Sequence, residues 1–322
     1  MIYKFSAFLE KPKRVDMYLS ALFEEFSRSY IQKLIDRGQV TLNGKTFYKN
    51  IKVKSGDEII IEIIVESLEI MDVDIFRLLR KMDLDVVFED AELIILNKQP
   101  ATNVHPVPGE GWRSGTLVNG ILEHCKDALP SIWWVQRPGI VHRLDKDTSG
   151  FIMIAKSDKM MNYLSETIKE RKIKKEYIAI VHGKVKNTDF KIESYMGRDK
   201  HDRTRMTVVD PVNPKLALTF WKVLGYIDNE YTVVRVRIET GRTHQIRVHL
   251  ASIGYPILWD KTYGNPKANT RINTMYQLSR QALHAYELEL ELYGELRKFQ
   301  APLKDDMKKI IWDVDISVSP EA

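Results

Sequence analysis

Two polar strings in the chain carry the residue types that do chemistry. The first is RPGIVHRLDKDTSG at residues 137–150, and the second is ETGRTHQIRVH at residues 239–249. Each crowds arginine, histidine, aspartate and threonine beside apolar segments with the composition of strands. Polar residues gathered where strands end are typical of binding and catalytic sites. The two strings therefore indicate an active site.

Asp145 is the residue of the first string best suited to catalysis. Pro138-Gly139 predicts a turn, Ile140-Val141 a brief buried strand, and a longer strand starts at Phe151. A carboxylate between two strands can be a nucleophile, a general base or a metal ligand. A metal site stays a possible role because Asp147 is nearby and hard cations favour paired carboxylate oxygens. The alternative is a turn aspartate that accepts backbone hydrogen bonds. The first string alone favours this structural role.

Two arginines of the second string change that balance. The segment predicts a turn and a helix start near Thr243, with Arg242 just before the helix and Arg247 in its first turn and a half. A helix N-terminus with two guanidinium groups favours an anionic ligand. Surface ion pairs are the alternative. Because the residues after Arg247 are apolar, at least one arginine needs a buried anionic partner, and Asp145 is a candidate.

Several other kinds of site are absent from the sequence. It contains no Gly-rich phosphate loop, no GxGxxG, no HExxH and no GxSxG motif. Cys125 is the single cysteine, which excludes an intrachain disulfide, a Cys-x-x-Cys pair and a thiolate zinc cluster, and fits a reducing cytoplasm. The charged N-terminal stretch lacks the apolar core of a signal peptide, and the apolar run at residues 59–65 is too short for a membrane helix.

Periodicities at the N-terminus predict a small α+β module over residues 1–66. Apolar residues at spacings of three and four predict a first helix over residues 15–26. A second helix is expected between Ser27 as N-cap and Gly38 as stop. The period then falls to two, and Asn43-Gly44 predicts a tight hairpin turn before further strands.

The net positive charge of the chain lies inside this module. Lys and Arg total 49 against 44 Asp and Glu, a formal net charge of only +5. Residues 28–54 hold seven cationic side chains against Asp36, namely Arg28, Lys33, Arg37, Lys45, Lys49, Lys52 and Lys54. Such a patch attracts phosphate groups. A solvated helix face with a lysine-rich edge strand is the alternative.

A larger second domain is expected over residues 83–322, after a linker at residues 67–82. It mixes strand-like runs with amphipathic helical stretches. The strand-like runs are at residues 86–88, 93–96, 151–155, 177–181 and 231–238, and the helical stretches at residues 158–170 and 243–252. The expected fold class is therefore α+β in both domains.

Three motifs of the N-terminal module carry a resemblance to a known RNA-binding module. They are Arg14-x-Asp16, SRSYIQKLIDRGQVTLNG at residues 27–44 and SGDEIII at residues 55–61. They resemble the small module of a small-subunit ribosomal protein and of tyrosyl-tRNA synthetases, whose second helix and following turn lie against structured RNA. The resemblance implies RNA contacts by Arg14, Ser27, Arg28, Lys33, Arg37, Asn43 and Lys45.

The motifs of the second domain resemble those of one enzyme family. HRLDKDTSG at residues 142–150, KKEYIAIVHG at 174–183 and GRTHQIRVH at 241–249 are similar to motifs of the RluA-type pseudouridine synthases. Asn97-Lys98, the segment 115–122 and MGRDKHDRTRM at 196–206 match further family features. The resemblance covers nearly the whole chain and points to the RluD-like branch, which carries an RNA-binding module ahead of a mixed, mainly antiparallel catalytic domain.

The resemblance assigns roles to residues of the two strings and of the segment between them. It implies that Asp145 is the essential aspartate, Tyr177 the active-site tyrosine and Arg247 the arginine paired with the aspartate. It implies that Arg143 helps to displace the target base. His142 and Arg242 are placed with Arg143 in the base-flipping and substrate pocket.

The implied reaction is the isomerisation of uridine to pseudouridine in RNA, most directly in large-subunit ribosomal RNA, with no cofactor and no metal. The uridine must leave its stack, which costs a few kcal/mol. An arginine beside Asp145 would keep the carboxylate ionised in an apolar pocket. Tyr177 could stack on uracil and move a proton, or be a plain core residue.

The expected protein is a cytoplasmic monomer that binds ribosomal RNA or ribosomal precursor particles and no membrane. Two other functions stay open at this point. The basic module alone would fit a non-catalytic RNA-binding or ribosome-assembly factor. Asp145 and Asp147 together would fit a metal-dependent nuclease or phosphatase.

Overall fold

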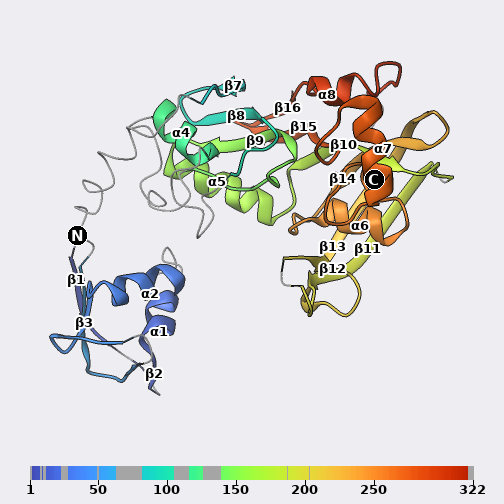
Figure 1. Ribbon diagram of the computed structural model, residues 1–322. Helices are drawn as coiled ribbons and strands as arrows, with labels where there is room; N and C mark the ends of the chain where they lie inside the picture. The colour runs from blue at the N-terminus through green and yellow to red at the C-terminus, as the bar shows by residue number, and fades with distance from the viewer. Residues whose placement is uncertain are drawn as a thin grey trace. The chain divides into compact units, whose positions relative to one another are not determined.

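The chain divides into two compact units, Met1–Leu78 and Leu79–Ala322. The computed structural model describes residues 2–7, 9, 12–22, 28–48, 51–62, 82–104, 116–125, 139–186, 188–202 and 204–317. Figure 1 shows the helices and strands of both units. The predicted linker 67–82 lies outside the described residues except for Met82. Within the described ranges, no helix has the length and apolarity needed to cross a membrane.

The first unit combines two helices with a small antiparallel sheet. The helices are α1 (Val15–Leu22) and α2 (Arg28–Asp36). The sheet order is β1 (Ile2–Ser6), β6 (Glu58–Glu62), β3 (Val40–Leu42) and β4 (Lys45–Thr46), and β2 (Lys13–Arg14) pairs separately with β5 (Lys52–Val53). The apolar faces of the helices and of β3 and β6 form one buried core.

The turns of the first unit form where the sequence predicts them. Asn43 and Gly44 have φ angles of 51° and 73°, which the hairpin between β3 and β4 requires. Gly38 has a φ of 71° and donates its N–H to the Ile35 carbonyl at 3.0 Å, so it ends α2. The expected N-cap, Ser27, lies outside the described residues. Strand β1 was not predicted.

One long mixed sheet organises the second unit (Figure 1). Its strands in spatial order are β12 (Met206–Thr207), β11 (Asp189–Arg198), β13 (Val212–Ile227), β14 (Tyr231–Ile238), β10 (Lys174–His182), β15 (Leu283–Leu292), β9 (Ser149–Ala155), β8 (Leu93–Lys98) and β7 (Val86–Glu89). Strand β16 (Glu295–Gln300) pairs with β15 beside this path. Every pairing is antiparallel except that of β15 with β9. The predicted α+β fold with a mainly antiparallel sheet is confirmed.

The helices of the second unit cover the sheet at its two ends (Figure 1). They are α4 (Leu117–Cys125), α5 (Asp158–Lys169), α6 (Gln245–Ser252), α7 (Pro266–Tyr276) and the short α8 (Asp305–Lys308). One face of β8 and β9 packs on α4, while the other face joins the main core with α5. Both strands are buried on both faces, which is why their sequences are continuously apolar rather than alternating.

Close packing at the centre of the sheet depends on a glycine of the first polar string. Gly150 has a φ of 111°, and a Cβ atom there would lie 2.1 Å from the carbonyl oxygen of Ala285. Only glycine therefore fits where β9 lies beside the start of β15. This crossing fixes the position of the loop that precedes β9.

The sequence located five of the ten strands of this sheet, β7, β8, β9, β10 and β14, together with helices α5 and α6. Helix α6 begins at Gln245 rather than near Thr243, because His244 has a left-handed φ of 56°. Strands β11, β12, β13, β15 and β16 and helices α4, α7 and α8 were not predicted as elements.

Two histidines are completely buried in the core of the second unit. His249 lies between the hydroxyl groups of Ser194 and Thr219, at 3.0 and 2.8 Å. His284 lies between Ser149 Oγ and the Ala301 carbonyl, at 2.8 and 2.9 Å. Burial lowers the pKa of each ring to about 4. Both histidines are therefore neutral at pH 7.

These histidines predict a loss of stability in mild acid. Below pH 6.5 the unfolded chain binds two protons that the folded chain does not accept until about pH 4, so stability is full above pH 6.5 and falls below it. We expect these two histidines together to lower the free energy of unfolding by roughly 2 to 3 kcal/mol per pH unit around pH 5. Tryptophan fluorescence during urea unfolding reports on this unit, because all six tryptophans follow residue 78. His249→Gln should reduce the slope by about 1.4 kcal/mol per pH unit, the share of one histidine, and an unchanged slope would contradict the assignment.

Candidate active site

A cavity of about 540 Å³ opens beside the loop that leads into β9. Its walls are the loop at residues 140–148, the start of β10, the end of α5 and the segment from Ile238 to Arg247. The two polar strings, separated by about ninety residues of sequence, therefore meet at one place. All six residues predicted for catalysis and the substrate pocket line it: His142, Arg143, Asp145, Tyr177, Arg242 and Arg247.

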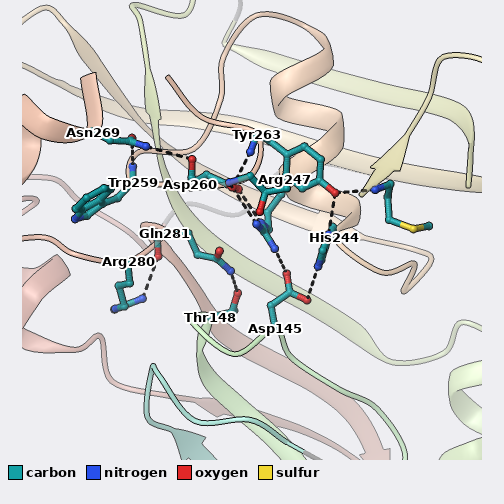
Figure 2. A network of polar contacts seen from close by, with 12 residues as sticks. Asp145, Thr148, His244, Arg247, Trp259, Asp260, Tyr263, Asn269, Arg280 and Gln281 are labelled. Atoms are coloured by element: carbon teal, nitrogen blue, oxygen red, sulfur yellow. Dashed lines mark hydrogen bonds and ion pairs between the residues drawn. The ribbon is translucent and has the colours of Figure 1, made fainter. Parts of the chain in front are cut away.

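Arg247 lies between two carboxylates (Figure 2). Its Nη1 donates to Asp145 Oδ2 at 2.8 Å, as the sequence predicted for this pair. Its Nε and Nη2 donate to the two oxygens of Asp260 at 2.7 and 2.9 Å. Arg247 thus makes a bidentate ion pair with Asp260 on one side and one hydrogen bond to Asp145 on the other. Its guanidinium carbon also lies 5.1 Å from the centre of the Tyr263 ring.

The two carboxylates differ in their exposure. The side chain of Asp260 is 0% exposed, while that of Asp145 is 19% exposed toward the cavity. Burial opposes ionisation of Asp260, but its hydrogen bonds with Arg247 and the attraction between them outweigh burial and lower its pKa. The same pairing outweighs burial at Arg247 and raises the pKa of its guanidinium. The charge of Arg247 is therefore permanent, and Asp145 faces it from the cavity side.

His244 extends this network from Asp145 to Tyr263 (Figure 2). The Tyr263 hydroxyl accepts the Met206 N–H at 2.9 Å and lies 2.8 Å from His244 Nδ1. On the other side of the ring, His244 Nε2 lies 3.9 Å from Asp145 Oδ1. Burial lowers the pKa of His244, so the ring is neutral. The sequence did not identify His244 as a site residue.

The backbone of the Asp145 loop is fixed by cations from other parts of the unit. Lys98 is 2% exposed, and its ammonium donates to the Lys146 carbonyl at 2.9 Å as well as to two carbonyls of its own loop. Arg280 donates to the Asp147 carbonyl at 3.3 Å and forms a two-bond pair with Asp306. These contacts hold the two residues after Asp145 by their main chain.

The end of the same loop is fixed by side-chain hydrogen bonds. Gln281 Nε2 donates to Thr148 Oγ1 at 2.7 Å (Figure 2). Leu144, immediately before Asp145, is 5% exposed and packs in the main core. Asp145 therefore projects from a loop that is anchored on both sides.

Two of the predicted pocket residues make hydrogen bonds within the protein. His142 Nε2 accepts the Met153 N–H at 2.9 Å, and burial lowers the ring's pKa to about 3, so His142 is neutral and supports β9. Arg242 is half-buried, and its Nε donates to the Leu216 carbonyl at 3.2 Å. Gln245, which the sequence missed, holds the turn before α6 through Thr240 at 2.7 Å and the Arg242 N–H at 3.1 Å.

Tyr177 and Arg143 differ from these residues because they make no hydrogen bond or ion pair within the described parts of the chain. Tyr177 is 6% exposed, and its ring lies 6.2 Å from that of Phe151. Burial and the nearby charge of Asp145 raise the pKa of its hydroxyl, which stays protonated. Arg143 is exposed at the cavity. Both have unused hydrogen-bonding groups that can meet a ligand.

The metal alternative finds no geometric support in the described residues. No group of three or more His, Cys, Asp or Glu side chains lies close enough together there to hold a metal ion. Asp145 is already bonded to the guanidinium of Arg247 at 2.8 Å, which disfavours a second cation at that carboxylate.

In the first unit, the predicted RNA contacts Arg14 and Arg28 meet at a buried carboxylate. Asp16 is 0% exposed and accepts hydrogen bonds from Arg14 Nε at 3.0 Å, Arg28 Nε at 2.9 Å and Gln32 Nε2 at 2.6 Å. Burial opposes ionisation of Asp16, but these bonds prevail and lower its pKa to about 2. Asp16 therefore holds two partly exposed arginines side by side.

The other predicted RNA contacts of the first unit have different surroundings. Lys33, Arg37 and Lys45 are exposed. Asn43 uses its amide within the unit, donating to Asp57 at 3.0 Å and accepting the Glu58 N–H at 2.8 Å. Ser27, and Lys49 of the cationic patch, lie outside the described residues.

Comparison with known proteins gives the family. A model of the RNA pseudouridylate synthase family matches residues 92–252, and an S4 domain model matches residues 13–59. The chain is 40% identical to the RNA pseudouridine synthase YlyB of Bacillus subtilis, across 94% of either protein. It is 38% identical to ribosomal large subunit pseudouridine synthase D of Neisseria meningitidis serogroup B, across 92% of this chain and 78% of that one.

A solved structure has the same fold. Human RNA pseudouridylate synthase domain containing 4 aligns with a TM-score of 0.58 at 21% identity, over 79% of this chain and 100% of that one. Fold and matches together define an RNA-modifying isomerase with a separate RNA-binding domain. The chain belongs to the RNA pseudouridylate synthase family, in its RluA/RluD-like branch, with an S4 domain as its first unit. The family and the enzyme class predicted from the motifs are confirmed.

The unequal burial of the two carboxylates predicts unequal effects on stability. Asp260→Asn should lower the free energy of unfolding by about 3 to 5 kcal/mol, because it leaves a buried guanidinium without its two-bond partner. Asp145→Asn should lower it by about 1 kcal/mol or less, because Arg247 keeps Asp260 and Asp145 is partly exposed. Urea unfolding followed by tryptophan fluorescence compares the two variants. Equal losses would show that Asp145 and Asp260 support Arg247 equally.

Proposed function

We propose that the enzyme isomerises uridines of large-subunit ribosomal RNA, with Asp145 acting on the sugar of an extruded uridine. The observation that carries the role of Asp145 is its bond to Arg247, 2.8 Å long, in the wall of the cavity. The ribosomal substrate is supported by relatives that are named ribosomal large subunit pseudouridine synthase D in Neisseria meningitidis, Buchnera aphidicola and Pasteurella multocida, at 37–38% identity.

Arg247 prepares Asp145 for this reaction. A fixed guanidinium at 2.8 Å sets the direction of the Asp145 carboxylate oxygens before the substrate arrives. Because Asp260 holds the other edge of the guanidinium, Arg247 does not have to move when Asp145 reacts.

The cations around the cavity fit an RNA strand whose base enters it. Arg143, Lys169 and Arg171 are exposed and Arg242 is half-buried among the residues that line the cavity. Their charges would meet phosphate groups on both sides of the target nucleotide. Arg143, which has no partner among the described residues and lies two residues before Asp145, is free to fill the gap that the extruded uridine leaves.

Tyr177 fits the role of a stacking partner and proton donor. Its ring is held by Phe151, and its hydroxyl stays protonated because burial and Asp145 raise its pKa. A protonated phenol can donate a hydrogen bond to the uracil or to the sugar but cannot act as a general base at neutral pH. The reaction exchanges a C–N bond for a C–C bond within one nucleotide and therefore needs no redox partner.

A cytoplasmic monomer that acts on ribosomal RNA or its precursor particles is part of this proposal. The S4 domain is the element that would grip folded RNA. The non-catalytic RNA-binding factor and the metal-dependent nuclease are not favoured, because the chain belongs to a family of isomerases.

The proposal predicts how replacing Asp145 by asparagine changes the pseudouridine content of cellular RNA. Cells that lack the enzyme are supplied with wild type, Asp145→Asn or Asp147→Asn, and pseudouridine is mapped in all RNA. Wild type and Asp147→Asn should restore pseudouridine in large-subunit ribosomal RNA, and Asp145→Asn should restore none, because an amide is neither a nucleophile nor a base.

Binding measurements complete this test. Purified Asp145→Asn should bind the RNA as tightly as wild type does, because Arg247 keeps its pair with Asp260 and the cations around the cavity are unchanged. Pseudouridine formed by Asp145→Asn would refute the role of Asp145. Restoration confined to transfer RNA would refute the ribosomal substrate and leave the role of Asp145 intact.

A second prediction concerns the S4 domain. Arg14→Gln/Arg28→Gln removes the two arginines held by Asp16 and should lower the slope of log affinity against log salt by about 1.5, because two phosphate contacts are lost. Filter binding at a series of salt concentrations measures the slope. Lys308→Gln/Lys309→Gln, which removes the same charge from exposed positions of the second unit, should leave the slope unchanged. Equal slopes in both double variants would show that Arg14 and Arg28 do not contact RNA phosphates.

A further inference from the structure

One polar group of the cavity is buried and has no partner. Lys175 lines the cavity and is 7% exposed. Its ammonium makes no hydrogen bond or ion pair with any residue that the structure describes. A buried charge without a partner is unfavourable, and desolvation accordingly lowers the pKa of Lys175. Glu239 is the carboxylate whose charge acts on Lys175, but its own ion pair, at 3.4 Å, is with Arg237.

The strand fixes where Lys175 points. Lys175 and Tyr177 are two residues apart in β10 and pair with Ile238 and Val236 of β14, so their side chains lie on one face of the sheet, about 7 Å apart along the strand. Glu176, between them, lies on the opposite face and binds Arg235 at 2.5 Å. Lys175 therefore reaches the wall of the cavity beside the tyrosine.

Its depth distinguishes Lys175 from the cations at the rim of the cavity, and its lack of a carboxylate partner distinguishes it from Arg247. Arg143, Lys169 and Arg171 are exposed at the rim, where a phosphate chain would pass. Phosphates remain at the surface when a nucleotide turns into a pocket, while the base goes inside. A cation within the wall thus meets the base rather than the backbone.

The chemistry of the reaction supplies a negative charge at the base. When the C1′–N1 bond breaks, its electron pair goes to N1 and is shared with the oxygens O2 and O4. C1′ loses an electron pair when this bond breaks, and there are two ways to replace it. Either an oxygen of Asp145 bonds to C1′, or Asp145 takes the proton of the C2′–H bond and the electron pair of that bond forms a C1′–C2′ double bond. In both routes uracil is an anion until C5 bonds to C1′, which releases Asp145 from C1′ or is accompanied by return of the proton to C2′. The C5 proton is then lost and N1 takes up a proton, so the product base is neutral.

We propose that the Lys175 ammonium donates a hydrogen bond to a carbonyl oxygen of the extruded uracil and stabilises the anion formed when the bond to the sugar breaks. This rests on the proposed role of the cavity as the uridine site. It gives Lys175 a contact with the reacting base, whereas Arg143 and the other rim cations contact the strand.

The test compares Lys175→Met with Lys174→Met, its neighbour in β10, which is exposed and paired with Glu289. The probe is a synthetic RNA containing a uridine that the wild-type enzyme modifies, used in single-turnover reactions. Lys175→Met should slow pseudouridine formation by roughly 10²- to 10³-fold, the usual effect of losing one donor to a developing charge. RNA affinity and the salt slope should not change, and Lys174→Met should behave as wild type does.

Substituting the base identifies the contact. In RNA with 2-thiouridine or 4-thiouridine at the target, sulfur is a poor acceptor, so one of the two substitutions should slow wild type but add no further loss in Lys175→Met. Additive losses for both substitutions would overturn the proposal. So would a salt slope that falls by about one in Lys175→Met, since this marks a phosphate contact.

Two further results keep this test independent of folding and of the proposed function. Lys175→Gln serves as a second uncharged variant, and unfolding midpoints equal to wild type show that the cavity is intact. Activity of Asp145→Asn would refute the role of Asp145 without altering the thio comparison. A target outside ribosomal RNA would refute only the substrate, because the synthetic RNA carries whichever uridine is modified.

Discussion

The site depends on the buried guanidinium of Arg247. A buried cation must be surrounded by acceptors, and Arg247 finds them in Asp260 on one side and Asp145 on the other. These contacts join the first turn of α6, the loop after Trp259 and the loop before β9. Three segments far apart in the sequence are thereby held at one point, and the cavity is the space that they enclose with β10.

The polar groups around the cavity divide into two sets. Asp260, His142, Gln245 and His249 make hydrogen bonds within the protein and hold the walls in place. Tyr177, Arg143 and Lys175 have none within the described residues, although Tyr177 and Lys175 are almost fully buried. Buried polar groups are rarely left unpaired without a functional reason. The second set is therefore available to the substrate, while the first keeps it in position.

Local sequence signals predicted a good part of the fold, for identifiable reasons. The N-terminal helices, the Asn43-Gly44 turn and the strands β8, β9, β10 and β14 follow from short-range periodicity and turn chemistry. Strand β13 (Val212–Ile227) was missed because Pro214, Lys215 and Lys222 interrupt its pattern. Its first four residues are exposed and the next six alternate between half-buried and buried, so one strand has two environments. Strand β15 alternates regularly, but its pairing with β9, β10 and β16 is decided by the rest of the sheet.

The sequence by itself determined the residue types of the site, the two polar strings, the pairing of Asp145 with an arginine and the family that these motifs indicate. The tertiary structure decided which partners complete them. Asp260, the partner of Arg247, lies outside every motif quoted above. Asp16 and His244 lie within motifs, but the motifs do not show that Asp16 binds both Arg14 and Arg28 or that His244 lies between Asp145 and Tyr263. The burial of Lys175 also depends on which strands flank β10. The residue type fixes the charge and the hydrogen-bonding capacity of a side chain. Only folding fixes its distance from a partner and its burial, and distance and burial set the strength of the interaction.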